Sequence, residues 1–352
     1  MNQSTFFHSG FFALVFFLIT GCQALPDGVA DKRLAKPQTK PNILFIVVDD
    51  MGMADIGSFG SEIDTPNLDK LAFAGTRLTN FSVASTCSPT RAMLLTGVDS
   101  HLAGLGNMLE ETSPNQKGQL GYEGVLNERV VTISELLRDN GYRTYLSGKW
   151  HLGGAENARP SARGFQKSFS LISGGASHFP DMRPAYAPSP DIKANYFKDG
   201  KKLETLPSNF KYSSQFYVDQ LIDYIEEDKA SEQPFFGVLA FTAPHWPLQA
   251  PNAAIAKYKG RYDRGYQVLL EQRFARQKQL GVIPANTQPN TSVRSATEDG
   301  KAWDELTKLE QLESARAMEV YAAMIDQVDV HVGRLISYLE ENNQLDNTMI
   351  VF

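Results

Sequence analysis

The sequence predicts an α/β fold with a mostly parallel central sheet and helices on both of its faces. Continuous apolar runs occur at Asn42–Val48, Phe235–Phe241 and Met349–Phe352, and such runs are typical of parallel strands that are buried on both sides. Segments with apolar residues at helical spacing lie between these runs. Strands that alternate with helices predict a parallel sheet, because each parallel pair needs a long crossover connection.

Residues 1–40 are predicted to lie outside this fold. Phe11–Thr20 is an apolar run too short to span a bilayer and is typical of the core of a signal peptide. It leads into Ile19-Thr20-Gly21-Cys22, which resembles the lipobox of bacterial lipoproteins. The resemblance implies a lipoprotein signal peptide over 1–22, a lipidated Cys22 and a polar tether over 23–40. Ordinary secretion is the alternative, since no Lys or Arg precedes the apolar run.

The expected location is the periplasm, with a lipid anchor at Cys22 as the only predicted contact with a membrane. By the rule of that lipoprotein family, a Gln rather than an Asp after Cys22 suits the outer membrane. The net charge of −6 at pH 7 argues against a non-specific nucleic-acid binder. An acidic protein can still hold a sulfate or phosphate ester in a local basic pocket.

The elements expected in the first half of the domain surround a single cysteine. In chain order they are a strand over Asn42–Val48, a helix from Pro66 to a stop at Gly75, a strand over Arg77–Val83, a helix over Pro89–Leu95 and a Gly-rich loop over 98–128. Thr65 is expected to cap the first helix. Cys87 is then placed at the N-terminus of the second helix, where free N–H groups and partial positive charge favour an anion.

The second half is expected to repeat the alternation of strands and helices. The predicted strands lie over Arg143–Ser147, near Phe169–Ile172 within loops over 155–211, over Phe235–Phe241 and over Met349–Phe352. The predicted helices run from the capping box Thr132–Glu135 to Gly141, around Tyr217–Ile225, over Gln267–Gln279 and from Trp303 towards Leu339. A polar linker is expected between Gln279 and residue 300.

Polar side chains follow three of these strands directly. They are Asp49 and Asp50, then Lys149 and His151, then His245. The ligand crevice of an open parallel sheet lies outside the carboxyl ends of its strands, so these clusters are expected to meet there. Two adjacent acids need a cation or many donors. Both can reach one ion only where the backbone turns out of the strand, a turn that Gly52 would permit.

Each of these features has a simpler interpretation when it is taken alone. Cys87, which has no disulfide partner after the leader, is most often a small buried thiol. Asp49 and Asp50 can be a helix cap and a solvated turn residue, and His245 between two prolines can be a packed loop residue. The occurrence of three polar clusters at three strand ends favours a shared site over these separate explanations.

The segment Cys87–Gly97 together with three others resembles the sulfatase family of the alkaline-phosphatase-like superfamily, and in particular bacterial arylsulfatases. The family signature is Cys or Ser, any residue, Pro, any residue, Arg, four residues, and Thr-Gly, and Cys87–Gly97 fits it with Thr90 where Ser is commoner. Further support comes from PNILFIVVDDMG at 41–52, GKWHLG at 148–153 and APHWPLQAP at 243–251. The resemblance covers the whole chain after the leader.

The resemblance implies a sulfuric ester hydrolase with a modified nucleophile and a metal. A maturation enzyme would oxidise Cys87 to formylglycine, and Asp49, Asp50 and residue 87 would bind a divalent ion, calcium by analogy with bacterial members. Arg91 would hold the formylglycine hydrate, and His151 would hydrogen-bond the modified residue and act as a base. Lys149 and His245 would contact a small-molecule or glycan sulfate ester, with His245 as the general acid.

Three other functions remain open at this point. The nearest is a phosphate or phosphonate monoester hydrolase of the same superfamily, which would use the same metal. The second is an inactive lipoprotein that binds sulfated glycans. The third is a thiol hydrolase that uses Cys87 and His151, which lacks an evident orienting acid and leaves Asp49 and Asp50 unexplained.

The resemblance also implies parts that follow the last predicted strand. In the family a late strand delivers an Asp-Asn pair to the metal, a Lys follows, and a smaller C-terminal subdomain completes the protein. The sequence ends at Phe352, where this pair is expected next. Residues 41–352 are therefore expected to be an incomplete N-terminal catalytic domain that lacks the C-terminal subdomain, binds calcium weakly, aggregates readily and is nearly inactive.

Overall fold

The computed structural model describes residues 40–186, 189, 191–289 and 301–352. The predicted signal peptide over 1–22, Cys22 itself and nearly all of the tether over 23–40 lie outside the described residues, as does the end of the predicted linker at 290–300. Within the described ranges, no helix has the length and apolar character needed to cross a bilayer.

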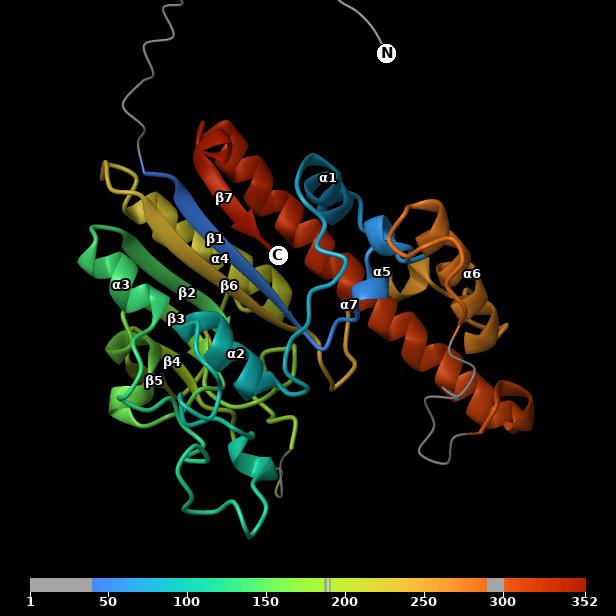
Figure 1. Cartoon of the computed structure of the whole chain (residues 1–352), viewed down its shortest axis with the longest axis horizontal. Coiled ribbons are helices and arrows are strands. Elements are labelled where there is room, and N and C mark those ends of the chain that lie inside the picture. The colour runs from blue at the N-terminus through green and yellow to red at the C-terminus, as the bar shows by residue number, and fades with distance from the viewer. Residues whose placement is uncertain (1–39, 187–188, 190, 290–300) are drawn as a thin grey trace, which may run out of the picture. The chain divides into compact units, whose positions relative to one another are not determined.

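A seven-stranded sheet forms the centre of the fold, with strand order β5-β4-β3-β2-β6-β1-β7 (Figure 1). The strands are β1 (Asn42–Asp49), β2 (Arg143–Lys149), β3 (Lys167–Leu171), β4 (Tyr196–Lys198), β5 (Lys201–Leu203), β6 (Phe235–Pro244) and β7 (Thr348–Val351). The neighbouring pairs β3–β2, β2–β6, β6–β1 and β1–β7 are parallel. The pairs β3–β4 and β4–β5 are antiparallel. The predicted mostly parallel sheet is confirmed.

Helices cover both faces of this sheet, as predicted. The helices of the described residues are α1 (Pro66–Ala74), α2 (Cys87–Thr96), α3 (Ile133–Asp139), α4 (Ser213–Glu227), α5 (Asn252–Lys257), α6 (Tyr266–Gln279) and α7 (Lys308–Glu341). Of these, α4 and α7 pack on one face of the sheet, and α2 and α3 pack on the other. The central strand β6 shows why two layers form. Its alternate residues Phe235, Leu239 and Phe241 join one apolar cluster, while Phe236, Val238 and Ala240 join the other.

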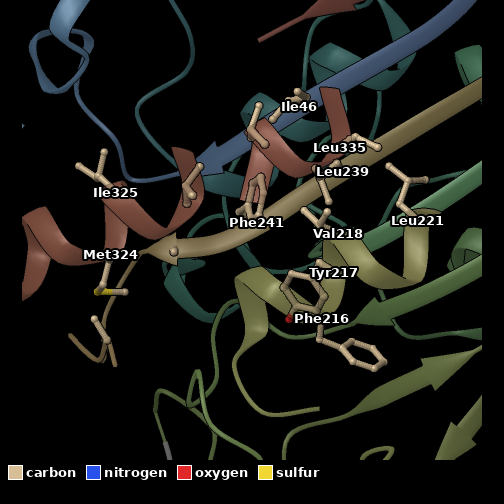
Figure 2. Close-up of a cluster of buried hydrophobic side chains, with 14 of the residues drawn as sticks. Ile46, Phe216, Tyr217, Val218, Leu221, Leu239, Phe241, Met324, Ile325 and Leu335 are labelled. Carbon is tan, nitrogen blue, oxygen red and sulfur yellow. The ribbon is translucent and has the colours of Figure 1, made fainter. Parts of the chain in front are cut away.

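The larger cluster lies between the sheet and the pair α4 and α7. Figure 2 shows Tyr217, Val218 and Leu221 of α4 and Leu335 of α7 close to strand residues of the sheet. The helical spacing of the apolar residues in α4 places them on one side of the helix. The smaller cluster includes residues of α2 and β2, so the helix that begins at Cys87 is anchored directly on the sheet.

The strand predicted over 77–83 is wrong. No strand forms there, and Leu78, Phe81 and Val83 are 60%, 67% and 62% exposed. The apolar residues of this segment do not alternate strictly, and strand propensity depends on packing against a buried face, which these exposed side chains lack. The segment is therefore part of the loop that joins α1 to α2.

Smaller differences concern element ends and short elements. The predicted helix over 89–95 begins two residues earlier, at Cys87, and the long helix begins at Lys308 after a capping box from Thr307 to Glu310. The Oγ1 of Thr65 does not cap α1 but accepts a hydrogen bond from the N–H of Gly57. The short elements α5, β4 and β5 were not predicted, because runs of three to six residues carry little periodicity.

Candidate active site

The end of β1 places two carboxylates at the carboxyl edge of the sheet. Asp49 is the last residue of the strand and is buried, whereas the side chain of Asp50 is 55% exposed. Asp50 has a φ of 63°, and this left-handed conformation turns the chain out of the strand. The turn was predicted at Gly52, but Gly52 has an extended backbone with φ of −77°. The strained residue is therefore the candidate ligand itself.

Asp49 lies between two buried cations. Its Oδ1 is 3.2 Å from a guanidinium nitrogen of Arg91, and its Oδ2 is 2.5 Å from the Nζ of Lys149. Burial by itself would raise the pKa of Asp49, but the charges of Arg91 and Lys149 outweigh it and lower this pKa to about 2. Asp49 is therefore ionised at neutral pH and remains available as an anionic ligand.

Arg91 joins two strand ends to the helix that carries the cysteine. It projects from α2, donates to the carbonyl oxygen of Lys149 at 2.9 Å and also contacts Asp49. Arg91 and Lys149 are both nearly fully buried. This connection holds α2 against the ends of β1 and β2, so the position of residue 87 is fixed relative to both cations.

Cys87 is the first residue of α2 and faces the acids of the first strand. Its Sγ is 4.0 Å from Oδ1 of Asp50. Burial, and then the charge of Asp49, raises the pKa of the Cys87 thiol. A thiol that stays protonated at neutral pH is a weak nucleophile. The unmodified cysteine is therefore poorly suited to be the nucleophile of a thiol hydrolase, the third function considered above.

His245 directly follows β6 and lies close to both Asp49 and Cys87. Its Nδ1 is 2.6 Å from the carbonyl oxygen of Trp246, so Nδ1 carries a proton that it donates there. Its Nε2 is 3.7 Å from Oδ2 of Asp50. Because Nδ1 is already a donor, Nε2 can donate a proton only when the ring is an imidazolium.

A second histidine, which the sequence did not single out, supports His245. The buried His178 donates from Nε2 to the carbonyl oxygen of His245 at 3.0 Å and is 2.8 Å from Oγ of Ser213 through Nδ1. Burial lowers the pKa of His178 to about 4, so this ring is neutral at physiological pH. His178 holds the loop of His245 in place without adding charge to the site.

The structure brings six of the seven predicted residues into one connected group. Short contacts link Asp49, Asp50, Cys87, Arg91, Lys149 and His245. The seventh, His151, lies two residues after Lys149 in the left-handed region, with φ of 56°, and its hydrogen bond goes to Glu110 rather than to this group. Glu110 was not predicted, because the loop that carries it has no periodic pattern.

The group has the donors that a divalent cation needs. One ligand atom each of Asp49, Cys87 and His245 lies within 4.8 Å of the others, and the carboxylate of Asp50 is 4.0 Å from Sγ of Cys87 and 3.7 Å from Nε2 of His245. Carboxylate oxygens suit hard cations such as calcium and magnesium. Sγ stands where an oxygen of an oxidised residue 87 would be, and an oxygen there suits the same ions better than sulfur does. The donor set therefore fits a hard divalent cation.

A polar network behind the site holds the turn at Asp50. The hydroxyl of Tyr321 on α7 donates to the carbonyl oxygen of Asp50 at 3.1 Å and contacts Oδ2 of Asp55 at 2.7 Å. Asp55 also accepts from the N–H of Gly52 at 2.8 Å and pairs with Arg273 on α6 at 2.5 Å. Arg273 in turn pairs with Glu62 at 2.7 Å. Two helices far along the chain are thus fastened to the loop that carries the candidate ligand.

Replacing Tyr321 with phenylalanine is expected to lower the free energy of unfolding by about 1–3 kcal/mol, the typical value for a hydrogen bond to a charged, partly buried group. Urea unfolding followed by circular dichroism would measure this change. Tyr338→Phe is the matched control, since the hydroxyl of Tyr338 on the same helix bonds the exposed Glu226 at 2.7 Å. Equal effects of the two substitutions would contradict a special role for the Tyr321 network.

The sheet and its carboxyl-edge site define an α/β protein of the alkaline-phosphatase-like fold. The family model described as sulfatase matches residues 41–352. The chain therefore belongs to the sulfatase family, as the signature at Cys87–Gly97 predicted.

Relatives and a solved structure support this membership. An uncharacterised sulfatase of Schizosaccharomyces pombe is 48% identical over 331 residues, which cover 89% of this chain and 57% of that protein. The arylsulfatase of Klebsiella aerogenes is 41% identical over 319 residues, covering 90% and 66%. The structure of Ps i-CgsB in complex with a neocarrahexaose matches with a TM-score of 0.62 and 28% identity, covering 88% and 57%. The chain thus spans less than two thirds of the length of these relatives.

Proposed function

We propose that this chain carries the catalytic site of a formylglycine-dependent sulfatase that hydrolyses sulfate monoesters. The observation that carries the proposal is the position of Cys87 at the start of α2, beside Asp50 and next to the Asp49–Lys149–Arg91 group. Two buried cations and two carboxylates around one nucleophile position suit an ester whose negative oxygens must be neutralised before attack. Membership of the sulfatase family and the arylsulfatase relative support the same chemistry.

The metal in this proposal is a divalent cation, for which we favour calcium. Asp49, Asp50 and an oxygen on residue 87 would hold it, since calcium prefers oxygen ligands. Such an ion would draw negative charge from the sulfate oxygens and so favour attack at sulfur. The low pKa of Asp49 keeps this carboxylate charged for that purpose over the whole neutral range.

The proposed nucleophile requires a maturation enzyme that oxidises Cys87 to formylglycine. In its hydrated form this residue offers one hydroxyl for attack on sulfur and a second hydroxyl for the release of sulfate. Arg91 and Lys149 would stabilise the charge that develops on the oxygens around residue 87. His245 would donate a proton from Nε2, which lies 3.7 Å from Oδ2 of Asp50, to the departing ester oxygen.

Exposed aromatic rings beside His245 suggest the kind of alcohol that leaves. The ring of Trp246 stacks near that of His245, with centroids 6.2 Å apart, and Tyr186 meets Trp246 edge-on at 4.4 Å. Tyr186 and Trp246 are 63% and 43% exposed. We propose that they contact a ring in the leaving group, which suits an aryl sulfate or a sulfated sugar.

The proposal is tested by the relative turnover of three substrates by the complete gene product, matured by co-expression with a formylglycine-generating enzyme. Nitrophenyl sulfate is expected to be hydrolysed about 10²-fold or more faster than nitrophenyl phosphate, and faster than an alkyl sulfate of similar size. Preference for the phosphate would favour the phosphomonoester hydrolase instead. Binding of sulfated glycan without turnover of any ester would favour the inactive lipoprotein.

A further inference from the structure

Glu110 makes a direct contact with a candidate catalytic histidine from an unexpected part of the chain. It lies in the short 3-10 helix Leu109–Glu111, within the long loop between α2 and α3. Its Oε1 is 2.8 Å from Nε2 of His151. The side chain of His151 is 10% exposed and that of Glu110 is 45% exposed, so the carboxylate closes the outer side of a largely buried ring.

The charges around this pair determine where the imidazole proton sits. The hydrogen bond from His151 lowers the pKa of Glu110, so the carboxylate is ionised and can only accept. Nε2 of His151 therefore carries a proton. Burial, together with the charges of Lys149 and Arg91, lowers the pKa of His151 although Glu110 opposes this shift. The ring is neutral, and its Nδ1 holds a free lone pair.

Nδ1 is also unused by the fold. It is buried and has no hydrogen-bond partner among the residues that the structure describes. A buried polar atom without a partner costs free energy and points to a role in function. An unpartnered nitrogen base beside Lys149 and Arg91 is suited to accept a proton from a group that is bound or formed there.

Because Gly174 has no side chain, the imidazole of His151 and the carboxylate of Glu110 can occupy the space beside it. A Cβ atom built at this position would lie 2.8 Å from Cε1 of His151 and 3.1 Å from Oε1 of Glu110. The loop after β3 therefore packs against the contact, and any side chain at this position would displace the imidazole or the carboxylate. The orientation of the ring is fixed from three sides, by the backbone of His151, by Glu110 and by this glycine.

We propose that Glu110 is a positioning residue that holds His151 as the Nε2–H tautomer, so that Nδ1 is the proton acceptor of the reaction. This inference rests on the proposed function. If residue 87 is a formylglycine hydrate, Nδ1 would take the proton of its second hydroxyl in the release step, and the O–H electrons would form the carbonyl bond. The bond from that carbon to the sulfate oxygen would break, and its electrons would leave with sulfate. His151 then returns the proton to water.

The tautomer is tested directly by nitrogen NMR of the histidine-labelled gene product. The wild type is expected to show protonated Nε2 and unprotonated Nδ1 for His151, and Glu110→Ala is expected to mix the two tautomers. Glu111→Ala is the matched control, since Glu111 is next in the chain and its exposed side chain has no hydrogen bond to any described residue. A wild-type ring protonated at Nδ1, or a tautomer unchanged in Glu110→Ala, would overturn the inference whatever the activity.

Kinetic measurements on Glu110 variants distinguish a role in positioning His151 from a role in the stability of the fold. Glu110→Ala is expected to lower kcat for nitrophenyl sulfate by about 10²-fold with little change in KM, the scale of a lost general base. Glu110→Gln, whose amide oxygen can still accept from Nε2, is expected to recover part of the rate. It should also move the acidic limb of the pH profile to lower pH, because the carboxylate charge that favours the imidazolium is lost.

The two proposals fail in different ways. A wild type that hydrolyses no sulfate ester would overturn the proposed function, while the NMR result would still decide the tautomer. An active enzyme with a shifted tautomer but unchanged kcat in Glu110→Ala would overturn the role of Glu110 and leave the sulfatase activity standing. Gly174→Ala provides a second variant, expected to reproduce the loss of kcat by displacing the same pair.

Discussion

Replacing Cys87 with alanine is expected to lower kcat/KM for sulfate esters by at least ~10⁴-fold, since loss of a covalent nucleophile costs about 10⁶-fold in a well-studied hydrolase. No other described side chain within the Asp49–Lys149–Arg91 group can provide a carbon with two hydroxyls. Initial rates on nitrophenyl sulfate would measure the loss. Because Cys87 is half-buried at the first position of α2, the alanine variant is expected to fold, and circular dichroism would verify this.

Cys87→Ser is the informative partner of that variant. It places one oxygen where Sγ now lies, 4.0 Å from Oδ1 of Asp50, but provides no second hydroxyl. We expect one equivalent of alcohol to be released and the reaction then to stop, with sulfate retained on the protein and detectable by mass spectrometry. Continuous turnover by either variant would show that residue 87 is not the nucleophile.

The sequence predicted the site well where chemistry follows a strand directly. Asp49, Lys149 and His245 each come at or just after the end of a buried parallel strand, and parallel strands deliver their carboxyl ends to one edge. Local order along the chain was therefore enough to predict that these residues meet. To predict the position of Cys87, it was necessary in addition only to predict that a helix begins near it, and α2 does begin at this residue.

The supporting residues could not be predicted, because they come from segments without a local signal for the site. Tyr321 fits the apolar spacing of α7, and only the fold brings its hydroxyl to the carbonyl oxygen of Asp50. Glu110 reaches His151 from an irregular loop, and His178 lies in another. The false strand at 77–83 has a related cause, since only the rest of the fold decides whether the apolar side chains of a segment become buried.

The second large effect is expected at Lys149. Its side chain is fully buried and its Nζ is 2.5 Å from Asp49, which leaves Asp49 with Arg91 alone once the ammonium is removed. Lys149→Ala is expected to lower kcat/KM by about 10²–10³-fold, the scale for losing one transition-state stabiliser. It is also expected to lower the free energy of unfolding by about 2–3 kcal/mol, less than the full loss of a buried pair because one cation remains.

Two further variants separate these contributions. Lys167→Ala removes another strand lysine with two acidic partners, at 3.0 Å from Glu227 and 3.1 Å from Asp228, but at the opposite end of the parallel strands. It is expected to leave kcat/KM unchanged. Lys149→Arg keeps the charge beside Asp49, so stability should largely return, while the rate should not, because a planar fork replaces a compact ammonium in a closed space. Full recovery of the rate in Lys149→Arg, or a wild-type rate in Lys149→Ala, would show that this ammonium serves the fold and not the reaction.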